Sequence, residues 1–253
     1  MFDYGEYYKH IAPVYNEVRL DREPEFSKTI STIRSNSNID AKTLDIGCGS
    51  GAYTTSLFKL GYDIIGVDKS AEQIAIAKKT ISAFVGDANS LPFENQTFDL
   101  CLMIMMLHQI PSHKIKTALF ETYRILKNRG KLIIKTQSRE NLKSRLDCKF
   151  FPKAYKNNIA RYPCVSTLVN YLRMHGEVKV LHTHSKVIYS IDESLDKLQK
   201  KYNSTIAMLT SQEFENGFCK IKDYYNQFDG QFTDDIYHTY IVATKERVGC
   251  SYY

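Results

Sequence analysis

Several features that mark particular protein classes are missing from this sequence. It has no tryptophan, and none of its six cysteines belongs to a Cys-x-x-Cys pair. Structural zinc sites and small disulfide frameworks normally need paired cysteines, so we expect neither, and we expect the thiols to be reduced. The longest apolar run, LCLMIMML, is far shorter than the roughly 20 residues that span a bilayer. The composition therefore excludes a metal framework and a membrane span.

Charge of one sign is not concentrated anywhere in the chain. Lys and Arg number 34 against 28 Asp and Glu, which gives a net charge of +6. Nucleic-acid-binding proteins usually carry a basic stripe, so charge alone does not predict a nucleic-acid partner. The N-terminal segment MFDYGEYYKH is polar and acidic, unlike a signal peptide. We expect a cytoplasmic protein that does not bind a membrane.

The pattern that is present alternates short apolar runs with helical segments. The expected strands are TLDI, DIIGV, AFVG, FDLCLMI and KLIIKT, followed by late strands at 177–190 and 237–244. Such alternation indicates βαβ units and a parallel sheet. The continuous hydrophobicity of FDLCLMI is typical of a central strand that is covered on both faces. Between the late strands, residues 192–228 are expected to form two helices.

Three glycines, Gly47, Gly49 and Gly51, separate the first strand from the helix that follows it. A bend without side chains lets a ligand approach the backbone closely. In an open parallel sheet, ligands bind outside the carboxyl ends of the strands, beside a helix N-terminus. The bend therefore predicts a ligand site, although a tight turn without a ligand is an alternative.

One ligand that fits such a bend is a dinucleotide. Gly47, Gly49 and Ala52 match the pattern G-x-G-x-x-A, and Asp68 ends the second strand, where a ribose-binding carboxylate belongs. Asp45, however, precedes the glycines by two residues and would repel a pyrophosphate. A carboxylate at that position suits a ligand with a cationic amino group or sulfonium, unless it only caps the next helix.

Three carboxylates follow three successive strands. Asp45 and Asp68 are joined by a third, Asp87, in the segment FVGDANSLPF. Because parallel strands end at the same edge of the sheet, these side chains are expected to share one crevice. The pattern favours a positively charged nucleoside over a diphosphate as the ligand.

Five motifs occur in order between Lys42 and Lys135: LDIGCGSG, GVDKS, GDANSLPF, FDLCLMIMMLHQI and RILKNRGKLII. Together they resemble the class I S-adenosylmethionine-dependent methyltransferases, in the methyltransferase type 11 branch of small-molecule enzymes. The resemblance implies a Rossmann-like parallel sheet with an antiparallel last strand, helices on both faces, and a mostly helical cap over the cofactor cleft. The last motif departs from the usual LKPGG, because Asn128 and Arg129 stand in place of Pro and Gly.

The resemblance also implies how the cofactor is held. The loop from Asp45 to Gly51 is expected to hold the methionine part; its other named members are Gly47, Cys48 and Gly49. Asp68 is expected to bind the ribose hydroxyls, and Lys69 to flank the adenine.

Five further residues complete the implied cofactor site. Asp87 is expected to accept the adenine amino group, with Ala88 beside the ring, and Met105 to line the cofactor near the acceptor. Tyr15 and Arg19, in YYKHIAPVYNEVR, are expected to close over the cofactor as part of a lid. Tyr15 could instead be an ordinary core residue.

Methyl transfer from a sulfonium is an in-line displacement that needs no metal and leaves S-adenosylhomocysteine. The protein aligns the reactants and excludes water. His108, in MMLHQI after the fourth strand, could take a proton from the acceptor. The alternative is that His108 is structural. Enzymes that methylate exocyclic base amines typically carry an Asn/Asp-Pro-Pro-aromatic motif at this position, which this chain lacks.

The predicted organisation is a single methyltransferase domain over residues 1–247, with a tail at 246–253. Its parts are lid helices at 1–40, a cofactor-binding core at 41–140, cap segments at 141–165 and 191–235, and late core elements at 166–190 and 236–245. The chain has 18 Tyr and 13 Phe, and those in the cap segments could form an apolar pocket for a small or planar acceptor.

The resulting hypothesis is methyl transfer from S-adenosylmethionine to oxygen, nitrogen or carbon of a small molecule. Two alternatives stay open: a non-catalytic protein that binds the cofactor, and an RNA-modifying methyltransferase. The sequence does not identify the acceptor or the oligomeric state.

Overall fold

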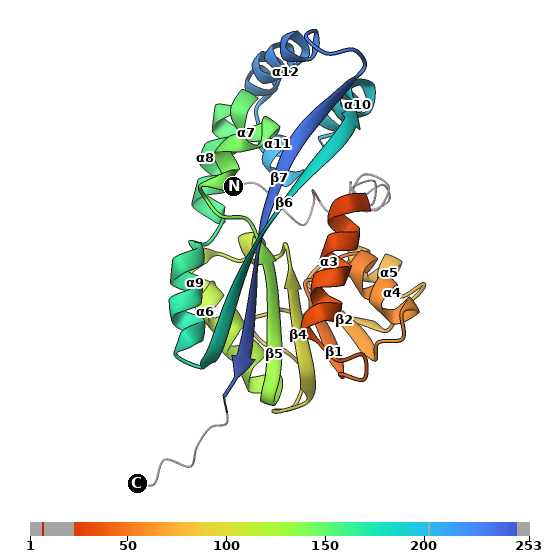
Figure 1. Ribbon diagram of the computed structural model, residues 1–253, viewed down its shortest axis with the longest axis vertical. Coiled ribbons are helices and arrows are strands. Elements are labelled where there is room, and N and C mark those ends of the chain that lie inside the picture. Colours follow the sequence, from red (N-terminus) through yellow and green to blue (C-terminus); the bar gives the residue numbers. More distant parts are fainter. Residues whose placement is uncertain (1–6, 8–22, 202, 247–253) are drawn as a thin grey trace.

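The structure is a computed structural model that describes residues 7, 23–201 and 203–246. Its centre is a seven-stranded sheet with the order β3-β2-β1-β4-β5-β7-β6 (Figure 1). The strands are β1 Thr43–Ile46, β2 Ile64–Asp68, β3 Ala83–Val85, β4 Phe98–Ile104, β5 Leu126–Thr136, β6 Gly176–Ser190 and β7 Gln231–Lys245. The helices are α3 Glu23–Asn36, α4 Ala52–Lys59, α5 Ala71–Ala77, α6 Ile115–Ile125, α7 Leu146–Phe150, α8 Pro152–Arg161, α9 Val165–Arg173, α10 Ile191–Gln199, α11 Ser204–Ala207 and α12 Ser211–Tyr225.

The first five strands are parallel, and β7 runs antiparallel to both of its neighbours, β5 and β6. This confirms the predicted Rossmann-like sheet with an antiparallel last strand. β4 coincides with the predicted run FDLCLMI and lies between β1 and β5. Its continuous hydrophobicity follows from this central place, because helices cover both of its faces.

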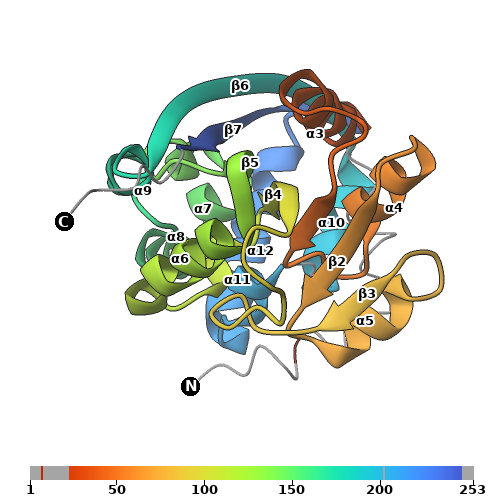
Figure 2. The same ribbon diagram turned by 90° about the horizontal axis from the view of Figure 1, so that it is seen from below.

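Alternate residues of β4 point into two different cores. Cys101 and Met103 pack in a cluster with side chains of α6 and α9. Leu100 and Leu102 pack on the opposite face, in a cluster that includes Ile33 of α3. Figure 2 shows α3 and α4 on one side of the sheet and α6 and α9 on the other. The period of two along a strand thus builds the two layers of the body.

β5 begins earlier than the expected strand KLIIKT. The strand begins directly after α6, at Leu126, and its register with β4 shifts between the pairs Phe98–Leu126 and Leu100–Lys131. Arg129, which stands where the related motif has glycine, has a positive φ of 65°. The segment in which Asn128 and Arg129 depart from LKPGG is therefore a bulge within β5 and not a turn that precedes the strand.

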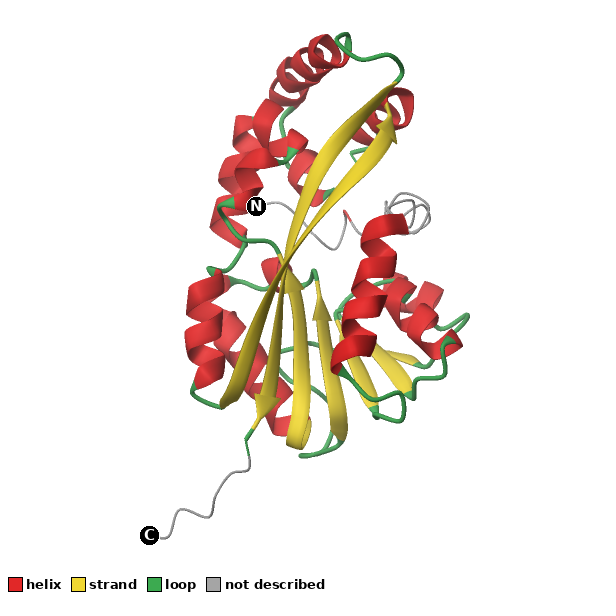
Figure 3. Cartoon of the chain, in the orientation of Figure 1, coloured by secondary structure: helices red, strands yellow, loops and turns green. Residues whose placement is uncertain are grey.

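The strands β6 and β7 form one long antiparallel pair that continues past the sheet. Their register runs without interruption from Gly176–Lys245 to Ser190–Gln231. Figure 3 shows the far end of this pair among helices that lie beyond the carboxyl ends of β4 and β5. We call these helices, α7, α8 and α10 to α12, together with the far ends of β6 and β7, the cap.

The cap has its own core, which is rich in aromatic side chains. Its buried members are Phe151, Ala154, Leu198, Ile206, Leu209, Phe214, Phe218, Ile221, Tyr225 and Phe232. Residues 192–228 were expected to contain two helices, but they contain most of α10 and all of α11 and α12. β7 begins at Gln231, before the expected late strand at 237–244, because Asp234 and Asp235 hide the alternation between buried Phe232 and Ile236. No helix of the described ranges is long and apolar enough to cross a bilayer.

Candidate active site

The glycine bend joins β1 to α4 and requires an unusual backbone. Gly47, Gly49 and Gly51 all have positive φ, at 75°, 56° and 85°. The Gly47 amide donates a hydrogen bond to the carbonyl of Val67 at 2.7 Å, which ties the bend to β2. A Cβ atom on Gly47 would lie 2.6 Å from the Cβ atom of Met106. The bend therefore excludes side chains both by conformation and by space.

Asp45 is buried beneath this bend with only 2% of its surface exposed. Its Oδ2 atom accepts a hydrogen bond from the Thr54 hydroxyl at 2.6 Å, and its Oδ1 atom has no partner. Burial, together with the nearby Asp68 carboxylate, raises the pKa of Asp45 to about 7. Gly51 and not Asp45 occupies the N-cap position of α4, so simple helix capping does not explain this carboxyl group. An uncompensated buried carboxyl is what a cationic amino group would satisfy.

Asp68 ends β2 and holds the bend from the other side. Its Oδ2 atom accepts the Gly49 amide at 2.8 Å, and its Oδ1 atom accepts the Ser70 amide at 2.9 Å. Burial raises the pKa of Asp68 above its usual range, although these backbone amides oppose the rise. Each carboxylate oxygen can accept a second hydrogen bond, so Asp68 can also accept bonds from two hydroxyl groups of a ligand.

Asp87 follows β3 and is more exposed than the other two carboxylates. Its Oδ1 atom accepts hydrogen bonds from the Asn89 amide and side chain, at 2.9 and 2.8 Å, and its Oδ2 atom lies 3.4 Å from Nζ of Lys69. The Asn89 amide is the main reason that the pKa of Asp87 is lowered. Ala88 packs partly buried against the main core. The predicted contacts of these residues with adenine stay predictions.

Cys48 lies within the bend, and Met105 follows β4, the strand next to β1. The Cys48 side chain packs against Gly66, where a Cβ atom would lie 2.6 Å from its sulfur. Met105 follows β4 with a positive φ of 54°, and its amide donates to the Lys135 carbonyl at 2.9 Å. It packs partly buried both with the α3-side core and with a cluster that contains Tyr162 of the cap.

His108 lies between the end of β4 and the cap. Its side chain is buried, and its ring stacks on Tyr162 with the centroids 4.5 Å apart. Its Nε2 atom lies 3.0 Å from Nε2 of Gln109, and its carbonyl accepts a hydrogen bond from Arg161. These contacts join the cap to the β4 exit. The proton-accepting role of His108 stays a prediction. Tyr15 and Arg19 lie outside the described residues.

A polar cluster on the α3 side of the sheet was not anticipated from the sequence. It consists of Glu25 and Thr29 from α3, Lys135 from β5, and His238 and Tyr240 from β7, all of them buried. The sequence signal that could have revealed the cluster is Lys135 in the otherwise apolar strand KLIIKT. A lysine is rarely buried in a protein unless it is paired. In the described ranges, no group of three metal-ligating side chains lies close enough to hold an ion.

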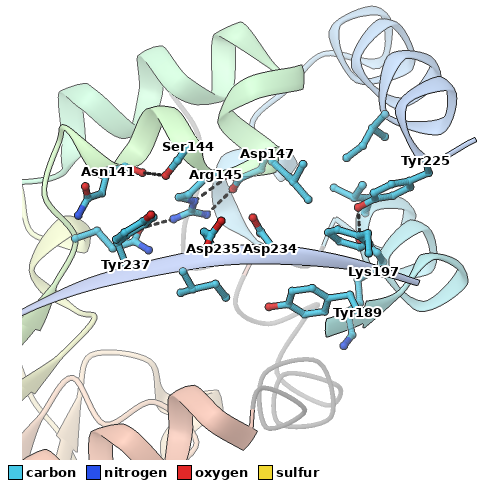
Figure 4. A pocket seen from close by; sticks show the side chains of 17 residues that line it. Asn141, Ser144, Arg145, Asp147, Tyr189, Lys197, Tyr225, Asp234, Asp235 and Tyr237 are labelled. Carbon is cyan, nitrogen blue, oxygen red and sulfur yellow. Dashed lines mark hydrogen bonds and ion pairs between the residues drawn. The ribbon is translucent and has the colours of Figure 1, made fainter. Parts of the chain in front are cut away.

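The cap contains a cavity of about 80 Å³ between α7 and β7 (Figure 4). Arg145 forms an ion pair with Asp147 at its wall and donates to Oε1 of Gln137 at 2.6 Å. Tyr225 and Ser194 share a hydrogen bond of 2.8 Å at the other end. None of the residues of the glycine bend lines this cavity. It is a feature of the cap and separate from the cofactor loop.

Comparison with known proteins supports the reading of the motifs. Residues 44–134 match the family described as a methyltransferase domain. The chain is 31% identical over 133 residues to tRNA (carboxymethyluridine(34)-5-O)-methyltransferase of Xenopus tropicalis, which covers 50% of this chain and 20% of that protein. It is 30% identical over 98 residues to demethylmenaquinone methyltransferase of Tropheryma whipplei, which covers 37% of this chain and 40% of that protein. The chain thus spans less than half the length of both relatives.

The fold is shared with solved structures. A SAM-dependent methyltransferase from Thermotoga maritima superposes with a TM-score of 0.59 at 20% identity, over 94% of this chain and 100% of that chain. The glycine bend, the orphaned Asp45 oxygen and the Asp68 carboxylate fit S-adenosylmethionine, the cofactor that the family implies. Residues 44–134 thus match the methyltransferase domain family, and the chain has the fold of solved S-adenosylmethionine-dependent methyltransferases.

Proposed function

We propose that the protein transfers the methyl group of S-adenosylmethionine to a small molecule held between the cofactor loop and the cap. The observation that carries this proposal is the position of the cap. Its helices, with the long β6–β7 pair, lie beyond the carboxyl ends of β4 and β5 (Figure 1). In this proposal the acceptor lies at these strand ends, next to the bend that would bind the cofactor.

The cofactor supplies an activated methyl group, and the residues of the chain supply alignment and exclusion of water. In this proposal, the bend and Asp45 fix the methionine part and Asp68 fixes the ribose. Met105 and Tyr162, which pack together beside the β4 exit, limit the space open to the acceptor. Holding reactants in line can lower the barrier by roughly 7–11 kcal/mol at most.

An RNA acceptor is the second candidate, and the tRNA-modifying relative is what favours it. RNA-binding enzymes depend on phosphate contacts, and their affinity falls steeply with salt. The net charge of +6 is modest for such a partner. Retention of the protein on immobilised tRNA at about 50 and 200 mM salt distinguishes an RNA acceptor from a small-molecule acceptor. Strong binding that salt abolishes, with label transferred to RNA, would replace the small-molecule proposal.

The proposal is tested by calorimetry and by a labelled-methyl screen. We expect micromolar binding of S-adenosylmethionine that Asp68→Ala abolishes. Incubation with labelled cofactor and the low-molecular-weight fraction of a cell extract should label a small product and release S-adenosylhomocysteine. Cofactor binding without any release would identify a non-catalytic binding protein. Failure to bind the cofactor, or binding of NAD in its place, would reject both the methyltransferase and the non-catalytic S-adenosylmethionine-binding protein.

The described cysteines agree with a reducing, cytoplasmic location, which is part of this proposal. Cys48, Cys101, Cys148, Cys164 and Cys219 are all unpaired thiols. Secreted proteins of comparable size commonly pair such residues. Fractionation of cells that express a tagged chain would check the location.

A further inference from the structure

One arginine side chain joins the cap to the short 3₁₀ turn Leu107–Gln109 that follows β4. Arg161 is the last residue of α8. Its Nε atom donates a hydrogen bond to the His108 carbonyl at 3.2 Å, and its Nη2 atom donates to Oε1 of Gln109 at 2.8 Å. On the cap side, its Nη1 atom donates to the Ser204 hydroxyl of α11 at 3.1 Å. The guanidinium group therefore connects two helices of the cap to the β4 exit.

The chemistry of arginine fixes the direction of the hydrogen bonds that begin at Arg161. A guanidinium group has donors and no acceptor. Gln109 must therefore turn its oxygen toward Arg161, and its amide nitrogen then lies 3.0 Å from Nε2 of His108. Because the amide nitrogen is a donor, Nε2 of His108 accepts this hydrogen bond through its lone pair. Arg161 thus orients Gln109, and Gln109 decides the role of Nε2 in His108.

This relay determines which protonated form of His108 is present. A neutral imidazole carries one proton and one lone pair, on different nitrogens. With the Nε2 lone pair engaged by Gln109, the proton is on Nδ1, and neither nitrogen offers a lone pair to the proton of an acceptor. The ring of His108 is also stacked on Tyr162, with the centroids 4.5 Å apart and both side chains buried. These contacts suit a residue that forms a wall of the site.

The cap side of Arg161 is organised by a second series of hydrogen bonds. Nη1 of Arg161 lies 3.5 Å from the Thr205 hydroxyl, which itself donates to Oδ1 of Asn158 at 2.8 Å. The Asn158 amide donates to Sγ of Cys148 at 3.3 Å. Thr205 belongs to α11, Asn158 to α8 and Cys148 to α7, and all three are buried. These bonds join three cap helices to the residue that contacts the β4 exit.

We propose that Arg161 is the positioning residue of the acceptor site, which seats the cap on the β4 exit and, through Gln109, keeps His108 from acting as a base. The inference rests on the proposed function, in which the acceptor lies between the cofactor loop and the cap. Tyr162 follows Arg161 directly and packs with Met105 beside the β4 exit. The place of the guanidinium group therefore also sets the place of this wall relative to the cofactor loop.

The first test reads His108 directly and needs no acceptor. In the full chain with ¹⁵N-labelled histidine, long-range NMR spectra report which ring nitrogen carries the proton, and His108→Phe identifies the signal. We expect the proton on Nδ1 near neutral pH. Gln109→Glu keeps an oxygen for Arg161 but offers His108 no N–H group, so Nε2 should become protonated. A proton on Nε2 in the wild-type protein, or an unchanged tautomer in Gln109→Glu, would overturn the relay.

The second test measures turnover with the acceptor that the labelled-methyl screen identifies. Turnover is counted per molecule that binds S-adenosylhomocysteine, so a variant that is only less stable keeps the wild-type value. Arg161→Met should lower this value about 100-fold through misalignment of the reactants. Arg173→Met is the matched control, because Arg173 is the last residue of α9 and is exposed, and it should have no effect. If Arg161→Met does not fold, Gln109→Leu removes the contact on the β4 side alone and should show the same kind of loss.

A third measurement distinguishes a wall residue from a base. His108→Phe keeps a ring against Tyr162 and removes both ring nitrogens. Turnover in this variant should fall less than about tenfold, whereas loss of a general base costs about 100-fold or more. A loss of that larger size in His108→Phe would make His108 the base and contradict the proposal.

The outcomes separate this inference from the proposed function. If the wild-type protein labels no small molecule, the proposed function fails together with the positioning role of Arg161, while the NMR result still decides the tautomer of His108. If labelling is robust and folded Arg161→Met keeps full turnover per cofactor-binding molecule, the proposed function stands and the positioning role is wrong.

Discussion

The cofactor-binding bend in the body and the core of the cap are packed in different ways. In the cofactor half, the bend between β1 and α4 works because glycines leave out side chains, and Gly47 lies directly against Met106. In the cap, large rings fill the space, and Phe151, Phe214 and Phe218 are all buried. The bend is thus specified by backbone conformation and the cap core by side-chain volume. This difference predicts which substitutions each region tolerates.

The largest effect is expected for Gly47→Ala. The positive φ costs roughly 1–2 kcal/mol for a residue with a Cβ atom, and the overlap with Met106 adds roughly 1–3 kcal/mol. Cofactor binding should fall below detection by calorimetry. Gly230→Ala is the matched control, because Gly230 has a φ of 67° and nothing within 4 Å of its Cβ position. Equal effects of the two changes would show that crowding at the bend is unimportant.

The cap should be sensitive at the ion pair between the partly exposed Arg145 and the buried Asp147 carboxylate. Arg145→Met leaves Asp147, whose side chain is 3% exposed, without its cation. Breaking a buried pair in this way should cost about 3 kcal/mol in the free energy of unfolding, measured with urea. Cofactor affinity should change less than twofold, since the cap cavity is separate from the bend. A large loss of cofactor binding would argue that the two regions act as one unit.

A third prediction concerns the pH dependence of cofactor binding. Because the pKa of Asp45 is raised to about 7, the folded protein retains a proton that the unfolded chain loses near pH 4. The stability of the cofactor-free protein should therefore fall as pH rises from about 4 to about 7. The ionised carboxylate favours a cationic ligand, so affinity should rise up to about tenfold per pH unit until pH 7. Asp45→Asn should remove the slope; an unchanged slope in that variant would place the titrating group elsewhere.

The smallest effect is expected for Lys69→Met. The Lys69 side chain is 84% exposed, and its ion pair with Asp87 spans 3.4 Å in solvent. Exposed pairs of this kind contribute less than about 1 kcal/mol, and salt weakens them further. Urea unfolding should barely distinguish this variant from the wild type. A loss as large as that of Arg145→Met would mean that burial does not decide the strength of these pairs.

The sequence predicted most of the body because its signals are local. FDLCLMI became β4 without a change of boundary, and Asp45 and Asp68 flank the glycine bend as expected from their strand ends. The cap was harder to predict, since Phe151 and Phe214 meet only after the chain has passed through four intervening helices, α8 to α11, and the strand β6. Glu25, Lys135 and His238 come from three distant segments, and no spacing in the sequence links them.

The way in which residues 191–230 leave the β6–β7 ladder has an evolutionary consequence. The segment departs after Ser190 and returns at Gln231, two paired residues, and the Ile191 amide donates to the Gly230 carbonyl at 3.0 Å. Its entry and exit are therefore neighbours, and a tight hairpin could close the same gap. A lineage could exchange this whole module for another and acquire a new acceptor while the nucleoside-binding machinery stays intact.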